Sequence, residues 1–341
     1  MSTHIQRDLY ELVAKMVFKQ IQPILEEKAE QIQSDPEGKH ATPHHDLEEC
    51  PLGISLESFV LHKVLGRGSF GKVMLAELKE SGELFAIKVL NKSSVLTNGY
   101  THYAMIEKRV MKLAVENPFL AHLHSTFQTK DNLFFVMEYI KGGSLFYHIE
   151  EKGRFDLVTT RFYAAELTCG LQFLHRNGVI YRDLKLDNVM LDQDGHIKIV
   201  DFGLCRDNMF GRQRANSFCG SEHYIAPEIY QKRTYTFPVD WWSFGVLLFE
   251  MLTGDAPFYG ADYDELYRSV CWDSPLYPSW IDTELKDLLI KEGDNDCSFV
   301  SNEVLDEAPK LSQGDSSSTG PMDQSAFADF AFINSKWCSA Q

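Results

Sequence analysis

Two short polar sequences, each enclosed by apolar residues, constrain this chain more than any other feature. They are Tyr181-Arg182-Asp183-Leu184-Lys185-Leu186-Asp187-Asn188 and Asp201-Phe202-Gly203. Phosphoryl transfer requires such residues, because a carboxylate must orient a hydroxyl while cations and metal ligands balance the phosphate charge. We therefore predict that Asp183 is the base, that Lys185 contacts the γ-phosphate, and that Asn188 and Asp201 bind magnesium. The alternative is a buried hairpin with satisfied polar residues.

Length, charge and cysteine spacing bound the remaining possibilities. The 341 residues allow two lobes, and a formal net charge of −16 argues against nucleic acid or an anionic membrane as the main partner. The seven cysteines include no C-x-x-C pair, which favours free thiols in a reducing compartment over a disulfide framework or a zinc site. No signal peptide or long apolar run occurs, so we expect a cytoplasmic protein.

The first part of the chain differs in character from the rest. Residues 1–33 carry apolar side chains at helical spacing, from Ile5 to Leu25, and predict a helical segment. Residues 34–58 are rich in Pro, Gly, His and acidic residues, which predicts a linker. From Phe59 the pattern becomes typical of strands, so we expect the folded domain to begin there.

A glycine-rich run follows within this domain. Its predicted ATP-binding residues are Leu65, Gly66, Gly68, Ser69, Phe70, Gly71 and Val73. Glycine lets backbone amides approach phosphates because no Cβ intervenes. A dinucleotide-binding fold uses the same glycine spacing, but there the run opens a helix. Here residues 73–78 continue as a strand, which favours a hairpin that covers phosphates.

Lys88 lies in the apolar strand Phe85-Ala86-Ile87-Lys88-Val89 and is predicted to hold the α- and β-phosphates of ATP. This cation needs an acidic partner, and Glu107, in an expected helix, is the candidate. For Glu107 a surface contact with a helical neighbour is the alternative.

Residues 133–139 form an apolar strand that ends at Lys141-Gly142-Gly143, and we expect a hinge between two lobes there. Four further residues are predicted to line the adenine pocket together with Ala86: Met137, Glu138, Ile140 and Met190. Asp240, at the start of another apolar helix, is expected to bind the backbone of residues 181–188.

Residues 59–291 resemble the catalytic domain of AGC-group protein kinases, and in particular the novel protein kinase C enzymes of delta and theta type. The motifs that carry this resemblance are the glycine-rich run, the Lys88 strand, residues 181–188 with Tyr181 in place of His, Asp201-Phe202-Gly203, and Ala226-Pro227-Glu228. The resemblance implies an α+β, two-lobed fold, with a small β-rich N-lobe (59–140) and a larger helical C-lobe (141–291). It also implies ATP and Mg²⁺, and transfer to Ser or Thr, because tyrosine kinases usually lack a lysine at the Lys185 position.

Several positions depart from this family pattern. The family's zinc-bound diacylglycerol module has no counterpart here, so we expect no direct sensing of diacylglycerol or calcium. Ser217 is the predicted phosphosite of the activation loop, for an upstream kinase, and Arg182 would meet its phosphate. Glu222 brings an acid to the substrate path, and Glu250 is the predicted contact for basic substrate residues. Ala331 replaces the phosphoacceptor of the tail motif.

The C-lobe is expected to be shortened, because tail-like sequence (292–341) follows residue 291 almost at once. In the family an arginine in the last helices pairs with the glutamate that corresponds to Glu228. No arginine follows Arg268 in this chain, so we expect Glu228 to be unpaired. Leaving one member of a buried ion pair alone costs about 3–5 kcal/mol.

These observations predict an ATP-dependent serine/threonine protein kinase of protein kinase C type. It would act on protein substrates with basic residues near the target hydroxyl and would not bind nucleic acid. Two alternatives remain open: a nucleotide-binding pseudokinase or scaffold, and an unstable truncated product.

Overall fold

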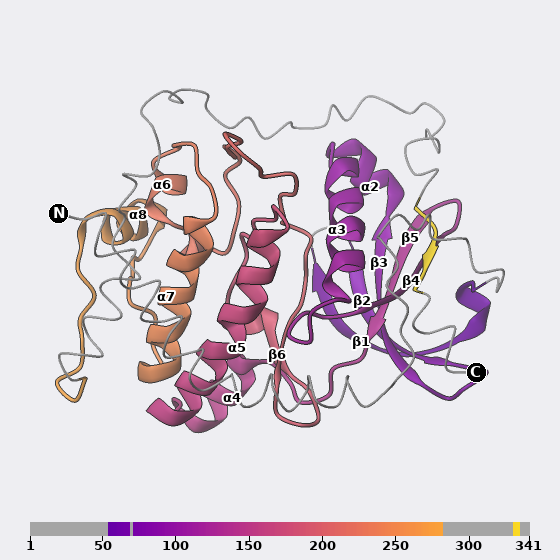
Figure 1. Cartoon of the computed structure of the whole chain (residues 1–341), viewed down its shortest axis with the longest axis horizontal. Helices are drawn as coiled ribbons and strands as arrows, with labels where there is room; N and C mark the ends of the chain where they lie inside the picture. Colours follow the sequence, from indigo (N-terminus) through magenta and orange to yellow (C-terminus); the bar gives the residue numbers. More distant parts are fainter. Residues whose placement is uncertain (1–53, 69–70, 282–329, 335–341) are drawn as a thin grey trace, which may run out of the picture.

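A β-sheet and a group of helices form the two ends of the computed structural model, which describes residues 54–68, 71–281 and 330–334 (Figure 1). The sheet lies in the first half of the chain and the helices in the second. Within the described residues, no helix is both long and apolar enough to cross a membrane. The fold is the two-lobed α+β arrangement that the sequence predicts.

The N-lobe is a six-stranded sheet with two helices on one side (Figure 1). The elements in chain order are η1 (Leu56–Ser58), β1 (Phe59–Gly68), β2 (Gly71–Leu78), β3 (Leu84–Asn91), α2 (Lys92–Thr97), α3 (Thr101–Ala114), β4 (Leu123–Gln128) and β5 (Asn132–Glu138). The strand order is β1-β2-β3-β5-β4-β8, where β8 is Phe332–Ile333 of the C-terminal tail, and consecutive neighbours pair antiparallel.

Strand β3 shows how the sequence sets the two faces of this sheet. Phe85, Ile87 and Val89 are buried in one apolar cluster, while Ala86 and Lys88 alternate with them on the other face. The period of two in a strand produces this division. Lys88 is thereby directed away from the apolar cluster, where it can meet charged groups.

The hairpin between β1 and β2 depends on glycine at one position. A Cβ added at Gly71 would lie 1.8 Å from the carbonyl oxygen of Val89 on β3. No side chain fits at that distance. The close approach of the β2 and β3 backbones therefore requires glycine at position 71.

The C-lobe contains the larger helices and a small second sheet. Its elements are α4 (Leu145–Lys152), α5 (Leu157–Arg176), η2 (Leu186–Asn188), β6 (Val189–Leu191), β7 (Ile197–Ile199), η3 (Glu222–Tyr224), α6 (Pro227–Tyr230), α7 (Pro238–Thr253) and α8 (Tyr263–Trp272). Helix α7 is apolar on nearly all sides and buried, as expected for a helix enclosed by other elements. Helices α5 and α7 pack together beneath β6 and β7.

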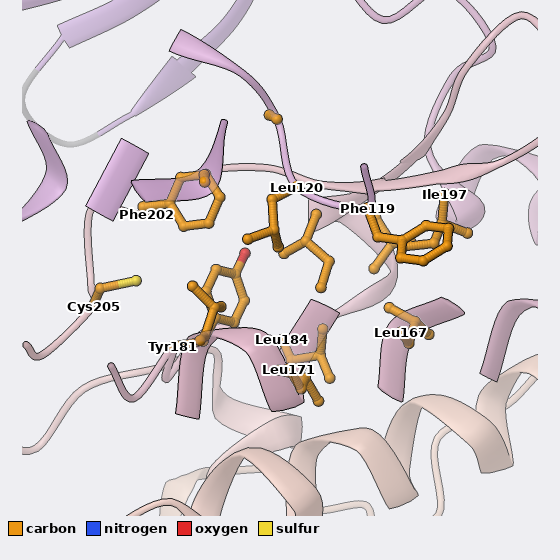
Figure 2. Packing of buried hydrophobic residues seen from close by; sticks show 14 of the residues in the cluster. Phe119, Leu120, Leu167, Leu171, Tyr181, Leu184, Ile197, Phe202 and Cys205 are labelled. Carbon is orange, nitrogen blue, oxygen red and sulfur yellow. The ribbon is translucent and has the colours of Figure 1, made fainter. Parts of the chain in front are cut away.

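One apolar cluster joins the two lobes, and its central part is shown in Figure 2. Tyr181 and Phe202 meet edge to face with ring centroids 5.9 Å apart, and both side chains are fully buried. Leu120 lies beside them. Met111 on α3 and Leu123 on β4 belong to the same cluster. The loops at residues 181 and 202 are therefore anchored to both lobes.

The described part of the C-terminal tail completes the N-lobe sheet. Strand β8 (Phe332–Ile333) pairs antiparallel with β4, where Thr126 is opposite Phe332. Phe330 is fully buried and meets Phe135 of β5 edge to face at 5.0 Å. The Lys108 ammonium lies 5.8 Å from the Phe330 ring, and the Lys112 ammonium lies 4.4 Å from the Phe332 ring. The tail thus packs against α3 and β4.

Candidate active site

Asp183 is the centre of a hydrogen-bonded group that joins two loops. The Asn188 side-chain amide donates to Asp183 Oδ2 at 2.8 Å, and Ser221 Oγ donates to Asp183 Oδ1 at 2.8 Å. Lys185 Nζ donates to Ser221 Oγ at 2.8 Å and lies 3.5 Å from Asp183 Oδ2. Three of the predicted site residues are therefore adjacent, together with Ser221, which sequence reasoning did not include.

The backbone around this group is strained at two residues, and hydrogen bonds to Asp240 hold it in place. Arg182 and Asp201 have φ angles of 70° and 54°, in the left-handed region that side chains other than glycine seldom adopt. The Asp240 carboxylate accepts from the Tyr181 amide at 2.8 Å and from the Arg182 amide at 2.7 Å. Asp240 is fully buried and also binds His175 Nε2. It makes the backbone contacts that the sequence predicts, and these fix the position of Asp183.

Lys88 joins the N-lobe to the second polar loop. Its ammonium donates to Glu107 Oε1 at 2.6 Å and to Asp201 Oδ1 at 2.8 Å. Glu107 is buried, whereas about half of the Asp201 side chain is exposed. The predicted Lys88–Glu107 pair is formed, and the surface alternative for Glu107 is wrong. A Cβ at Gly203 would lie 3.1 Å from Asp201 Oδ1 and 3.2 Å from Lys88 Nζ, so any larger residue there would press on this ion pair.

The four charged groups have different protonation tendencies. Burial would lower the pKa of Lys88, but the Asp201 and Glu107 carboxylates reverse this and raise it above its usual range. The Lys88 cation lowers the pKa of Asp201. Burial raises the pKa of Glu107 and of Asp183, and for Asp183 the Lys185 charge partly opposes the effect. Asp201 is thus the more firmly ionised of the two aspartates, and Asp183 the better proton acceptor.

The expected metal ligands present oxygen atoms on neighbouring segments. Asn188 directs its NH₂ group toward Asp183, so its Oδ1 is the atom left for a cation. The described residues contain no group of three or more His, Cys, Asp or Glu side chains that could hold a metal. The amide oxygen of Asn188 and the carboxylate of Asp201 are hard oxygen donors of the kind that Mg²⁺ takes, usually one or two from the protein with phosphates and water as the other ligands.

The predicted adenine-pocket residues lie on strands of the N-lobe sheet, at the hinge and on β6 of the C-lobe. Ala86 and Met137 are paired across β3 and β5, and Val73 is opposite Lys88 on β2. Met190 on β6 approaches from the C-lobe, and Ile140 is buried beside the hinge. The remaining predicted residues within the described part are Leu65, Gly66 and Gly68 on β1, Gly71 on β2 and Glu138 at the end of β5. Ser69 and Phe70 lie outside the described residues.

Glu138 has a structural role that the sequence did not reveal. Its backbone amide donates to the His122 carbonyl at 3.1 Å. Its carboxylate accepts from the His122 amide at 2.7 Å and from Lys198 Nζ at 3.0 Å. Its amide therefore holds it to His122 of the N-lobe, and its carboxylate links His122 to Lys198 of the C-lobe sheet.

Ser217 is linked to the catalytic loop through Tyr235. The Tyr235 hydroxyl donates to the Ser217 carbonyl at 2.7 Å and accepts from Arg182 at 3.0 Å. Arg182 also donates to the carbonyls of Leu204 and Cys205. The guanidinium expected to meet a Ser217 phosphate is thus in the same cluster, and it already positions the loop that carries Asp201.

Glu250, the predicted substrate contact, is bound to Tyr224. The Tyr224 hydroxyl donates to Glu250 Oε2. Burial raises the pKa of Glu250 to about 7, the Tyr224 hydrogen bond opposes this, and the Asp187 charge adds to it. Near neutral pH this carboxyl is poised between its two charge states. A substrate cation would favour the ionised form.

Glu228 on α6 is buried, and it forms no ion pair with any residue in the described part of the chain. It is 7% exposed, and its Oε2 has no hydrogen-bond partner within the described residues. Burial raises the pKa of Glu228, and a hydrogen bond from its own backbone and the charge of Arg233 partly oppose this rise. Residues 282–329, which include Lys286 and Lys291, lie outside the described part of the chain.

We expect Glu228→Gln to raise the stability of the folded protein by about 1–3 kcal/mol at pH 8, because it removes an unpaired buried charge. A folded-state pKa above the unfolded value means that stability is lost as pH rises through that pKa. The gain in stability from Glu228→Gln should therefore be smaller at pH 5.5, where Glu228 carries less charge. Thermal melting at the two pH values measures it.

The matched control is Glu166→Gln. Glu166 is also buried, but it accepts from the Ile197 amide at 2.9 Å and bonds His196 Nδ1 at 2.5 Å. That substitution should lower the melting temperature. If Glu228→Gln lowers it to the same extent, Glu228 has a partner outside the described residues and is not an orphan charge.

Comparison with known proteins assigns the chain to a group. Residues 59–311 match the family described as the protein kinase domain. Protein kinase C delta type of Homo sapiens is 52% identical over 326 residues, covering 83% of this chain and 48% of that protein. Protein kinase C-like 1B of Caenorhabditis elegans is 48% identical over 261 residues, covering 76% of this chain and 37% of that protein. The chain spans about half the length, or less, of these curated relatives.

Proposed function

The chain belongs to the protein kinase family, and from this premise we propose that it transfers the γ-phosphate of ATP to serine or threonine side chains, as a protein kinase of protein kinase C type. One observation carries the proposal. Lys88 contacts Glu107 and Asp201 at the same time, while Asp183 is held by Asn188. This joins the two lobes in the arrangement that phosphoryl transfer requires. This arrangement of the catalytic residues counts against the alternative of a pseudokinase or scaffold.

Each residue of the set has a separate task. The Asp183 carboxylate accepts the proton of the substrate hydroxyl, which its raised pKa favours. Lys185, 3.5 Å from that carboxylate, offers its charge to the transferred phosphate. Lys88 orients the α- and β-phosphates because Glu107 and Asp201 fix its position. These groups are already in place, so little reorganisation accompanies the reaction.

Protein kinases generally use ATP and Mg²⁺, and the residues here fit both. When bound, ATP supplies the phosphoryl group and Mg²⁺ neutralises its charge. We assign the metal to Asn188 and Asp201. The adenine would bind among Val73, Ala86, Met137 and Met190, and the glycine-rich run 65–71 would cover the phosphates.

Protein substrates follow from the family, and we propose that they carry basic residues near the target hydroxyl. Glu250 supports this, because it is an acidic side chain in contact with Tyr224, close to Ser221 and the catalytic group. An upstream kinase would phosphorylate Ser217, and Arg182 would meet the added charge.

We also propose the organisation of the chain and its compartment. Residues 1–33 would form a helical segment, 34–58 a linker, 59–291 the kinase domain and 292–341 the tail. Strand β1 begins at Phe59, which supports the second boundary, although the family match extends to residue 311. Cys169, Cys205, Cys219 and Cys271 are free thiols, in keeping with a cytoplasmic protein.

The test uses the full chain and two measurements. Magnesium-ATP should raise its melting temperature, and the protein should phosphorylate a serine peptide that contains arginines. A peptide in which alanine replaces serine controls for background. Stabilisation by ATP without phosphorylation of any basic peptide would favour the scaffold, and the absence of both would contradict the proposal.

A further inference from the structure

The segment that touches the catalytic carboxylate continues into an exposed acidic residue. Ser221 Oγ is 2.8 Å from Asp183 Oδ1, and Glu222, the next residue, begins the 3₁₀ turn η3. Consecutive Cα atoms are about 3.8 Å apart. A substrate residue opposite Glu222 would therefore lie within about two positions of the phosphorylated hydroxyl.

The backbone of Glu222 is fixed while its side chain is free to bind. The Tyr230 hydroxyl donates to the Glu222 carbonyl at 2.8 Å. The side chain is exposed, and it forms no ion pair with any residue in the described ranges. An exposed carboxylate on a fixed backbone is available to a cation that arrives with a substrate.

Three aromatic rings pack together, and one of them, Tyr230, is hydrogen-bonded to the backbone of Glu222. The Phe218 ring is 5.9 Å from Tyr230 and 6.3 Å from Tyr263, and Tyr230 and Tyr263 are 5.7 Å apart. Tyr230 is buried, whereas Tyr263 on α8 is 47% exposed. Helices α6 and α8, which carry the two tyrosines, lie close together (Figure 1). We name Phe218, Tyr230 and Tyr263 the aromatic shelf.

Electrostatics connects Glu222 to the shelf. Burial raises the pKa of Tyr230 and of Tyr263, and the Glu222 charge contributes to the rise in both. The Tyr230 hydroxyl, 2.8 Å from the Glu222 carbonyl, joins the shelf to the residue that carries this charge. An aromatic face with a carboxylate at its edge suits arginine, whose planar guanidinium stacks on rings and pairs with carboxylates.

We propose that Glu222 and the aromatic shelf form a subsite for an arginine within two positions of the phosphorylated serine or threonine. The inference rests on the proposed kinase function and extends it by assigning a residue that sets substrate choice. The subsite is separate from Glu250, which is engaged by Tyr224.

The experiment uses the full chain and a set of peptides with one serine. Arginine, leucine or glutamate occupies one of the four positions from two before the serine to two after it, and all other residues are constant. We expect kcat/KM to be about three- to tenfold higher for arginine than for leucine at one of these positions. Glutamate should be the worst residue there.

The variants then test the two parts of the subsite. Glu222→Gln should reduce the arginine-to-leucine ratio to near one. Tyr263→Ala should reduce it partly, and Tyr263→Phe should retain it because the ring remains. Glu151→Gln removes one exposed charge on α4, far from α6 and α8, and is the matched control that should keep the full ratio.

Failure of this inference can be told apart from failure of the proposed function. Phosphorylation of the leucine peptide reports on kinase activity alone, and the ratio reports on the subsite. Fluorescence anisotropy with the same peptides gives a binding ratio even if no peptide is phosphorylated. A ratio near one in the unmodified protein, or a ratio that Glu222→Gln leaves unchanged, would overturn the proposal.

Discussion

Asp183→Asn should lower kcat by about 10²–10⁴-fold while nucleotide affinity stays near its original value. The amide keeps the size of the side chain and one oxygen, which can accept from Asn188, and its NH₂ group can donate to Ser221 Oγ, but it cannot accept the substrate proton. Asp183 forms no contact with Lys88, so the nucleotide contacts should be preserved. Steady-state kinetics and titration with ATP separate the two effects.

Asp201→Asn provides the contrast. This change removes the negative charge 2.8 Å from Lys88 Nζ together with the proposed metal ligand. It should weaken magnesium-dependent ATP binding as well as turnover. The control is Asp194→Asn, which changes an exposed aspartate in the turn between β6 and β7 and should have no effect. Equal and small effects of the Asp183 and Asp201 variants would refute the assigned roles.

Phe330→Ala should destabilise the protein by about 3–5 kcal/mol, because it removes a fully buried ring and leaves a cavity between α3 and the sheet. Total stabilities are roughly 5–15 kcal/mol, so this is a large fraction. Helix α3 carries Glu107, and we expect activity to fall in parallel as the Lys88–Glu107 pair loosens. Chemical denaturation and the peptide assay measure the two effects.

Two further substitutions test whether loss of tail docking causes the lower stability and activity of Phe330→Ala. Phe210→Ala removes a ring that is 58% exposed and should cost no more than about 1 kcal/mol. Ala331→Glu adds a charge at an exposed position whose carbonyl accepts from Lys108 Nζ at 3.3 Å, and it should raise activity or stability. Unchanged stability in Phe330→Ala would mean that the tail does not dock in solution.

The sequence predicted the parts of the site that lie within motifs. Asp183, Asn188, Asp201, Lys88 and Glu107 each occur in a local pattern whose chemistry can be reasoned from residue type and spacing. The contact between Asp240 and the loop backbone was also foreseeable, because an aspartate at the start of an apolar helix needs donors. These predictions rest on local chemistry, which the fold preserves.

Contacts between distant segments could not be read in this way. Ser221 binds Asp183, and Tyr235 joins Arg182 to Ser217, yet neither residue has a local signature. The Lys198–Glu138 pair likewise depends on how the hinge meets the small sheet. The sequence around each of these residues is typical of an exposed side chain. Only the tertiary fold brings the two partners of each contact together.

Strand β8 also affects the tendency of the molecule to self-associate. The outer side of β4 would otherwise offer unpaired amides and carbonyls, and an open strand edge of this kind templates pairing with other chains. The short tail strand occupies part of that edge, with Thr126 opposite Phe332 and the Asn334 amide donating to the His124 carbonyl. Release of the tail would therefore expose a strand edge that can pair with other chains, and docking of the tail covers it.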